Sequence, residues 1–265
     1  MLLIRDGRII RRNMSQDKEL NLINVVGIGP GNISMMSYDA VEVIKGSDTI
    51  VGYPVYLKLV EELTCGKEII STPMKQEVER CRIAFEEAEK GRKVAVISSG
   101  DAGIYGMASL MYELLPEHPS CEIRIVAGIT AANSGAAVLG APLSVDFAVI
   151  SMSDLLTPFE LIEKRLKAAA SSDMVIVLYN PSSHKRKDYL ARACELIKEY
   201  IPSGRACGYV KNIGREGQEA VTLTFDELSH TEVDMFTTVY IGNSQSYIEN
   251  RKMITRRGYD KGGQL

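Results

Sequence analysis

Short, unbroken runs of apolar residues recur along this chain, and they constrain its fold more than any other feature. These runs are continuous rather than alternating in polarity, which is typical of strands buried on both faces of a parallel sheet. The first five, rich in valine and isoleucine, cover residues 22–28, 48–53, 67–71, 93–99 and 122–128. Residues 77–90 place apolar side chains at helical spacing, and Gly91 supplies a C-terminal stop. The alternation predicts an α/β fold whose first sheet is mostly parallel.

The pattern changes near Gly128. A small-residue helix is expected after it and ends by Pro142, followed by helices at 159–170 and around Leu190, Cys194 and Ile197. Further strands are expected at 147–152, 173–179, 206–212, 219–225 and 236–242. The last of these follow one another without long helices, which predicts a second, mixed sheet. We therefore predict two α/β domains, at 21–127 and 128–265, after an N-terminal appendage at 1–20 that forms a short hairpin through Asp6-Gly7.

Composition excludes several classes of protein. The 265 residues are 45% hydrophobic and carry a formal net charge of −3, so no broad basic surface is available for nucleic acid. The five cysteines are scattered and there are three histidines, a pattern that predicts no metal site and reduced thiols. The charged N-terminus lacks the apolar core of a signal peptide, and no stretch approaches the ~20 apolar residues of a membrane span. A cytoplasmic protein is expected.

The first apolar run ends in the glycine loop "VVGIGPGN" at residues 25–32. A dinucleotide fingerprint would need a third small residue where Asn32 stands and an acid where the second strand ends at Tyr53. Pro30 also removes a backbone donor from the turn, and no Gly-Lys-Ser/Thr follows as in a phosphate-binding loop. The loop is therefore a poor phosphate cradle. It is either a wall of another ligand site or a tight strand-to-helix turn without a ligand.

A second glycine-rich loop, "SSGDAGIYGMA" at residues 98–108, follows the fourth strand. Ligands of open α/β sheets lie outside the carboxyl ends of the strands, and both loops belong to that edge. Its glycines permit close backbone approach. Asp101 is suited either to bind a ribose or amine or to cap the next helix, and the pattern leaves both open.

The second half offers further polar candidates. Thr130 is suited to cap a helix or to contact a ligand. The basic run from Lys185 to Lys187 is either the solvated start of a helix or a cationic patch for a polyanion. The segment "GYVKNIGREGQE" at 208–219 adds Lys211 and Arg215, with a flexible loop at Gly214 and Gly217.

Taken in order, these motifs resemble a known family. "VVGIGPGN", "SSGDAGIYGMA", "AGITAANSGAAVLGAPLSVDFAVISMSDLLTP", "VLYNPSSHKR" and "GYVKNIGREGQ" are similar to segments of the tetrapyrrole methyltransferases, the class III S-adenosylmethionine enzymes. The similarity spans about residues 22–259. "LYNPSS", "GREGQ" and "SDLLTPF" resemble the cobalamin-pathway branch that methylates C17 of precorrin-3B or of cobalt-factor III, whereas the two glycine loops identify only the superfamily.

The resemblance implies two α/β domains with S-adenosylmethionine bound in the cleft between them, a homodimer, and methyl transfer coupled to contraction of the macrocycle. It places cofactor contacts at Pro30, Ser99, Gly100, Asp101, Ile104, Tyr105, Thr130, Ala131, Asn180 and Gly208. Relatives often have Asp or Ser at the position of Asn32. They often have Pro at the positions of Ala102 and Arg256.

The implied chemistry requires few catalytic side chains. Methyl transfer from a sulfonium is an in-line displacement that depends on alignment, whereas ring contraction also requires proton handling. Our candidates for that role are Tyr53 and Lys75, against the alternatives of an edge-of-core tyrosine and a surface lysine. Substrate contacts, including those to the carboxylates of the tetrapyrrole, are expected at Gly29, Gly31, Asn32, Lys185, Arg186, Lys211 and Arg215.

Other functions stay open at this point. One is a sister enzyme that methylates another macrocycle position, or a superfamily member that methylates a protein or RNA. Another, from a different class, is a nucleotide-dependent oxidoreductase or a non-catalytic tetrapyrrole binder.

Overall fold

The first half of the chain forms a five-stranded parallel sheet in the order β5-β4-β6-β3-β7. The structure is a computed structural model that describes residues 2–5, 8–11, 20–183 and 186–259. The strands are β3 (Asn21–Gly27), β4 (Thr49–Gly52), β5 (Glu68–Ser71), β6 (Val94–Ser98) and β7 (Cys121–Val126). The predicted parallel sheet is confirmed.

Helices cover both faces of this sheet, which explains why its strands read as continuous apolar runs. Val25 packs with Phe85 on the face covered by α3 and α4, whereas the next residue, Val26, packs with Ile44 on the face covered by α1 and α2. All four side chains are fully buried. The helices are α1 (Tyr38–Gly46), α2 (Pro54–Lys58), α3 (Glu77–Glu89) and α4 (Ala108–Leu114).

The second half forms a mixed five-stranded sheet in the order β12-β11-β13-β10-β9, as predicted. β9 and β10 are parallel, and the other neighbours are antiparallel. The strands are β9 (Phe147–Ser151), β10 (Val175–Tyr179), β11 (Ala206–Lys211), β12 (Glu219–Thr224) and β13 (Thr237–Ile241).

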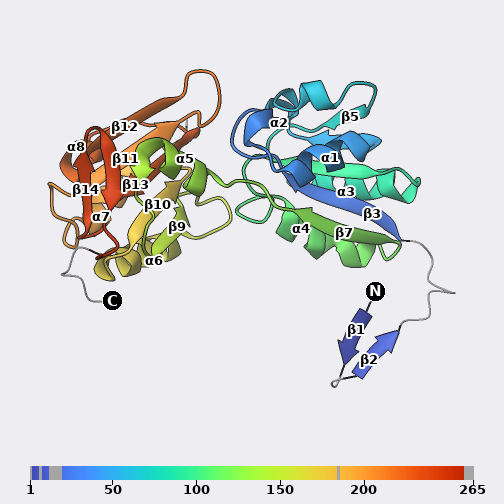
Figure 1. Ribbon diagram of the computed structural model, residues 1–265, viewed down its shortest axis with the longest axis horizontal. Coiled ribbons are helices and arrows are strands. Elements are labelled where there is room, and N and C mark those ends of the chain that lie inside the picture. The colour runs from blue at the N-terminus through green and yellow to red at the C-terminus, as the bar shows by residue number, and fades with distance from the viewer. Residues whose placement is uncertain (1, 6–7, 12–19, 184–185, 260–265) are drawn as a thin grey trace.

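Helices α6, α7 and α8 pack on one face of the second sheet and α5 packs on the other. Ile176 and Leu178 of β10 belong to the core under α6 and α7, and Val177 between them belongs to the core under α5. These helices are α5 (Ala131–Leu139), α6 (Phe159–Ser171), α7 (Tyr189–Ile197) and α8 (Phe225–Ser229). Figure 1 shows the two sheets in separate lobes, joined where the chain leads from β7 into α5.

A small third sheet was not predicted. Strands β14 (Ser246–Glu249) and β15 (Lys252–Thr255) form a hairpin, and β15 pairs with the two-residue strand β8 (Gly140–Ala141) after α5. Asn250 and Arg251 turn the hairpin with φ values of 50° and 60°. Because asparagine tolerates this left-handed region but arginine rarely enters it, the sequence gives only a weak hairpin signal here.

At the N-terminus, β1 (Leu2–Arg5) pairs with β2 (Arg8–Arg11) in antiparallel register. The predicted turn, Asp6-Gly7, lies outside the described residues. The predicted boundary at residue 128 falls in the segment between β7 and α5, and the domain limits stay a prediction.

Two further findings apply to the described residues. No helix there is both long and apolar enough to cross a membrane. Nor does any group of three or more His, Cys, Asp and Glu side chains in those ranges have an arrangement that could hold a metal ion.

Candidate active site

A cleft of about 190 Å³ lies where the loops of the two lobes meet. It is formed by the loops after β3, β6 and β7 of the first sheet and by the ends of β10, β11 and β13 of the second. All the predicted cofactor residues except Gly208 line it: Pro30, Ser99, Gly100, Asp101, Ile104, Tyr105, Thr130, Ala131 and Asn180. The structure thus brings together residues that lie up to 150 positions apart in the sequence.

Gly208 lies instead on β11 beneath α5. A side-chain carbon at this position would lie 3.0 Å from Cδ1 of Leu139, so the glycine allows the helix to approach the strand. Its predicted contact with a cofactor stays a prediction.

The two glycine loops of the first lobe are joined by backbone hydrogen bonds. The amide of Gly29 donates to the carbonyl of Gly100 over 3.0 Å, and the amide of Gly100 donates back over 2.8 Å. The amides of Ile28 and Asn32 are also used, by the carbonyls of Ser98 and Gly214. These donors therefore point to protein carbonyls and do not form a cradle for phosphate, in agreement with the poor dinucleotide fingerprint.

Asp101 ties its loop to the segment before α5. One carboxylate oxygen accepts from the amide of Gly103 at 2.8 Å, and the other accepts from the amide of Gly128 at 2.9 Å. Gly128 itself packs against the loop so closely that a side-chain carbon there would lie 2.1 Å from the carbonyl oxygen of Gly100. Asp101 thus fixes the shape of the loop. It does not cap α4, which begins at Ala108.

The start of α5 is held by two tyrosines of the second sheet, the half-buried Tyr179 and the buried Tyr240. The hydroxyl of Tyr179 accepts from the amide of Ala132 at 2.6 Å and shares a hydrogen bond with the hydroxyl of Thr130. The hydroxyl of Tyr240 donates to the carbonyl of Ala131 at 2.7 Å. Burial raises the pKa of Tyr179 and of Tyr240, so both remain neutral phenols at neutral pH.

The wall formed by the second lobe is built on the end of β9. Tyr105 reaches across from the first lobe, where its hydroxyl donates to the carbonyl of Val149 at 3.1 Å and accepts from the amide of Ser151 at 3.2 Å. Asn180, with a φ of 52°, donates its side-chain amide to the hydroxyl of Ser151 at 3.0 Å.

Arg215 crosses the cleft in the opposite direction. Its Nε donates to the carbonyl of Pro30 at 2.7 Å, and its Nη2 donates to the hydroxyl of Ser99 at 2.8 Å. The guanidinium also lies 6.0 Å from the centre of the Tyr56 ring. Burial lowers the pKa of Arg215 from its usual value and raises that of Tyr56.

The two predicted catalytic residues are not among those that line the cleft. Tyr53 precedes α2, and the ring of Tyr56, one turn later, packs edge-on against it with ring centres 5.3 Å apart. It is Tyr56 that borders the cleft. Lys75 lies in an exposed turn between β5 and α3 with a φ of 70°. Its backbone amide donates to the Glu77 carboxylate at 3.1 Å.

The predicted substrate residues have separate surroundings. Arg186 forms an ion pair of 2.7 Å with Asp154, and Lys211 forms one of 2.7 Å with Asp234. Lys185 lies outside the described residues. Gly29, Gly31 and Asn32 lie in the loop beside Pro30, and among the members of the predicted set that the structure describes, Arg215 is the one that lines the cleft.

Several residues that line the cleft were not predicted. They are Tyr56, Tyr179, Asn212, Ile213, Met235, Phe236, Thr237 and Thr238. Asn212 and Tyr179 stand at strand ends, which is a usable signal. Thr237 and Thr238 instead begin β13, an antiparallel strand that brings its amino end to the same edge of the sheet.

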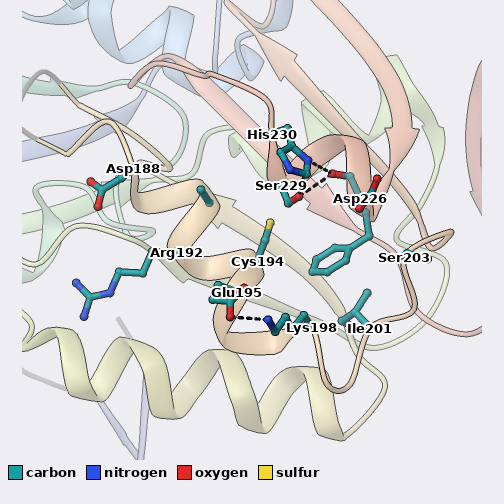
Figure 2. Close-up of a pocket in the computed structure, with 12 residues that line it drawn as sticks. Asp188, Arg192, Cys194, Glu195, Lys198, Ile201, Ser203, Asp226, Ser229 and His230 are labelled. Carbon is teal, nitrogen blue, oxygen red and sulfur yellow. Dashed lines mark hydrogen bonds and ion pairs between the residues drawn. The ribbon is translucent and has the colours of Figure 1, made fainter.

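A larger hollow of about 770 Å³ lies elsewhere, between α7 and α8 (Figure 2). Its lining mixes acidic and basic side chains, such as the Lys198–Glu195 pair at 2.6 Å. It contains none of the predicted site residues and no convergent strand ends, so the smaller cleft is the better candidate for the active site.

Comparisons with known proteins show which family this chain resembles. Residues 22–229 match the family model described as tetrapyrrole (corrin/porphyrin) methylases. A probable cobalt-factor III C(17)-methyltransferase of Salmonella typhimurium is 44% identical over 239 residues, which cover 90% of this chain and 99% of that protein. A precorrin-3B C(17)-methyltransferase of Sinorhizobium sp is 34% identical, covering 86% of this chain and 91% of the relative. The crystal structure of the methyltransferase CobJ superposes with a TM-score of 0.81 at 34% identity, covering 89% of this chain and 99% of that one.

Proposed function

The chain belongs to the tetrapyrrole (corrin/porphyrin) methylase family and is an S-adenosylmethionine-dependent methyltransferase, and we propose that it methylates C17 of cobalt-factor III or precorrin-3B with ring contraction, in cobalamin biosynthesis. The observation that carries this proposal is the 44% identity to the Salmonella protein along 99% of its length. Because both relatives are named as C(17)-methyltransferases, that position is favoured over other positions of the macrocycle.

The chemistry of the cleft fits S-adenosylmethionine. The methyl donor combines an amino-acid zwitterion, a ribose, an adenine and a cationic sulfur. The cleft offers one carboxylate and one guanidinium from Asp101 and Arg215, several hydroxyl and amide groups, and an apolar wall that includes Ile213 and Phe236. Placed polar groups beside apolar side chains are typical of small-molecule sites.

The bound donor supplies an electrophilic methyl group, and the protein supplies alignment. The loops at Pro30 and Gly100 are fixed to each other and to the second lobe, so the cleft walls are largely formed before a ligand binds. Holding two reactants in line in this way can contribute ~7–11 kcal/mol to lowering the barrier.

The roles of individual residues extend this proposal. We assign the cofactor contacts to the predicted residues that line the cleft. Binding of tetrapyrrole carboxylates by Arg186 and Lys211 is proposed from their charge, although each already has an aspartate partner. Tyr53 and Lys75 remain candidates for proton handling, and Tyr56 joins them because it borders the cleft.

The quaternary state and location are also proposals. We propose a homodimer, as the family resemblance implies, and a cytoplasmic location, as the biosynthetic role suggests. Light scattering on the purified full chain tests the dimer, and a monomer at micromolar concentration would contradict it.

The decisive experiment is anaerobic incubation of the enzyme with S-adenosylmethionine and either cobalt-factor III or precorrin-3B, followed by mass spectrometry. We expect one of the two tetrapyrroles to gain one methyl group, and the position is then read by NMR. If neither substrate gains a methyl group, the C17 assignment is wrong. Calorimetry with S-adenosylhomocysteine and NAD(P) separates the oxidoreductase alternative, since only that alternative predicts tight NAD(P) binding.

A further inference from the structure

Two glycine loops from different lobes interlock beside the cleft. A side-chain carbon on Gly31 would lie 2.1 Å from the carbonyl oxygen of Gly214, and one on Gly214 would lie 2.2 Å from the sulfur of Met35. The amide of Asn32 donates to the carbonyl of Gly214 at 3.1 Å. Backbone therefore packs on backbone here, an approach that glycine permits at both positions.

Arg215 extends this contact into the cleft. Its guanidinium gives one hydrogen bond to the carbonyl of Pro30 and one to the hydroxyl of Ser99. Both acceptors are neutral, whereas Arg186 and Lys211 each have a carboxylate partner.

The loop that carries Arg215 is braced from within. The amide of Gly214 donates to the side-chain oxygen of Gln218 at 2.7 Å, and the amide of Arg215 donates to the carbonyl of Asn212 at 2.9 Å. The planar guanidinium is thus presented in a fixed direction, and its fork matches two acceptors at once.

We infer that Arg215 is a positioning residue for the methyl donor: by holding Pro30 and Ser99 it fixes the wall of the donor site from the opposite lobe. This inference rests on the proposed function, because it takes the cleft as the site of S-adenosylmethionine. It departs from the sequence-based prediction that Arg215 binds a tetrapyrrole carboxylate. A carboxylate that captured Nε and Nη2 would release the two hydrogen bonds that hold the donor site closed.

The test is a double-mutant cycle between Arg215 and Ser99, with S-adenosylhomocysteine as the ligand in calorimetry on the full chain. We expect Arg215→Ala to weaken binding of this ligand by about 10-fold or more, the range for loss of hydrogen bonds to a charged group. Once Arg215 is removed, Ser99→Ala should cost less affinity than it does in the wild type, because the part of its effect that depends on the hydrogen bond to Arg215 has already been lost. Arg215→Lys keeps the charge but not the fork, so its affinity should lie between wild type and Arg215→Ala.

Glu216→Ala is the matched control, since this neighbour is exposed in the same loop, and it should bind like wild type. Affinity for the tetrapyrrole, followed by absorbance titration, is measured on the same variants. The inference would be overturned if Arg215→Ala bound S-adenosylhomocysteine normally, or if the losses in the cycle were fully additive. If Arg215→Ala lost only tetrapyrrole affinity, the role of Arg215 as a ligand of a tetrapyrrole carboxylate would be supported instead. If Arg215→Ala does not fold, the cycle is run with Arg215→Lys, and additivity there has the same meaning. Failure of the wild type to bind S-adenosylhomocysteine would instead count against the proposed function.

Discussion

Gly29 and Gly100 exchange two backbone hydrogen bonds, so the turns after β3 and β6 form one structural unit at the edge of the first sheet. Both residues have positive φ, 71° and 69°, and a side-chain carbon on Gly29 would lie 2.5 Å from the carbonyl oxygen of Met35. The unit lies directly beside Pro30 and Asp101, which line the cleft. Its glycines therefore shape the wall of the cleft through the backbone.

This relationship predicts that Gly29→Ala destabilises the protein and impairs donor binding together. Left-handed backbone costs an L-residue about 1–2 kcal/mol, and the collision with Met35 adds to that cost. Urea unfolding should show the loss, and S-adenosylhomocysteine affinity should fall with it. Gly46→Ala is the control, because the end of α1 has open space around it and no positive φ. Equal stability of the two variants would contradict the prediction.

A second prediction concerns the hydroxyl of Tyr179, which holds the first turn of α5 through Ala132 and Thr130. Tyr179→Phe leaves that buried amide without its acceptor, a change that costs about 1–3 kcal/mol. We expect a lower unfolding midpoint and weaker S-adenosylhomocysteine binding, because Thr130 and Ala131 line the cleft. Tyr112→Phe, at an exposed tyrosine of α4, should change neither.

The sequence predicted the framework of the fold well for a physical reason. Strands such as β3 and β6 are buried on both faces, so they appear in the sequence as continuous apolar runs. The carboxyl ends of parallel strands also indicate at which edge of the sheet a ligand binds. It missed Thr237 and Thr238 because β13 runs antiparallel and presents its other end to the cleft. It also did not reveal that Arg215 meets Pro30, since a contact between residues 185 positions apart leaves no local pattern.

The prediction of Tyr53 as a catalytic residue shows that sequence alone also does not fix which of two nearby tyrosines borders the cleft. The sequence placed a tyrosine at the end of β4, but α2 starts there and turns Tyr56 towards the cleft. We expect Tyr56→Phe to lower kcat more than Tyr53→Phe, by up to about 10²-fold if the phenol takes part in proton transfer. Steady-state kinetics with the tetrapyrrole decide this, with Lys75→Ala measured alongside. A larger loss in Tyr53→Phe would support the residue first predicted.

If Arg186 and Lys211 bind carboxylates of the tetrapyrrole, their loss should affect the affinity for the tetrapyrrole but not the affinity for the methyl donor. Arg186→Ala and Lys211→Ala should each weaken tetrapyrrole binding and leave S-adenosylhomocysteine binding intact, because neither side chain lines the cleft proposed for the donor. Absorbance titration and calorimetry on the same samples measure the two affinities. An equal loss of both affinities would contradict the proposal that these residues bind the substrate.

The Lys211–Asp234 pair also predicts a pH dependence of stability. Burial alone would raise the pKa of Asp234, but hydrogen bonds from Lys211, Thr237 and the amide of Phe236 outweigh it and lower that pKa below its usual value of 3.8. A carboxylate with a lowered folded-state pKa stabilises the protein fully above its unfolded-state pKa, and this contribution is lost as pH falls through the folded value. Because the pair is partly exposed, the contribution should be below about 1 kcal/mol. Urea unfolding should therefore show Asp234→Asn less stable than wild type near pH 7, with the difference shrinking as pH falls below 3.8 and through the lower folded-state pKa of Asp234. A difference that persists unchanged in acid would mean that packing around Asp234, and not its charge, accounts for the loss.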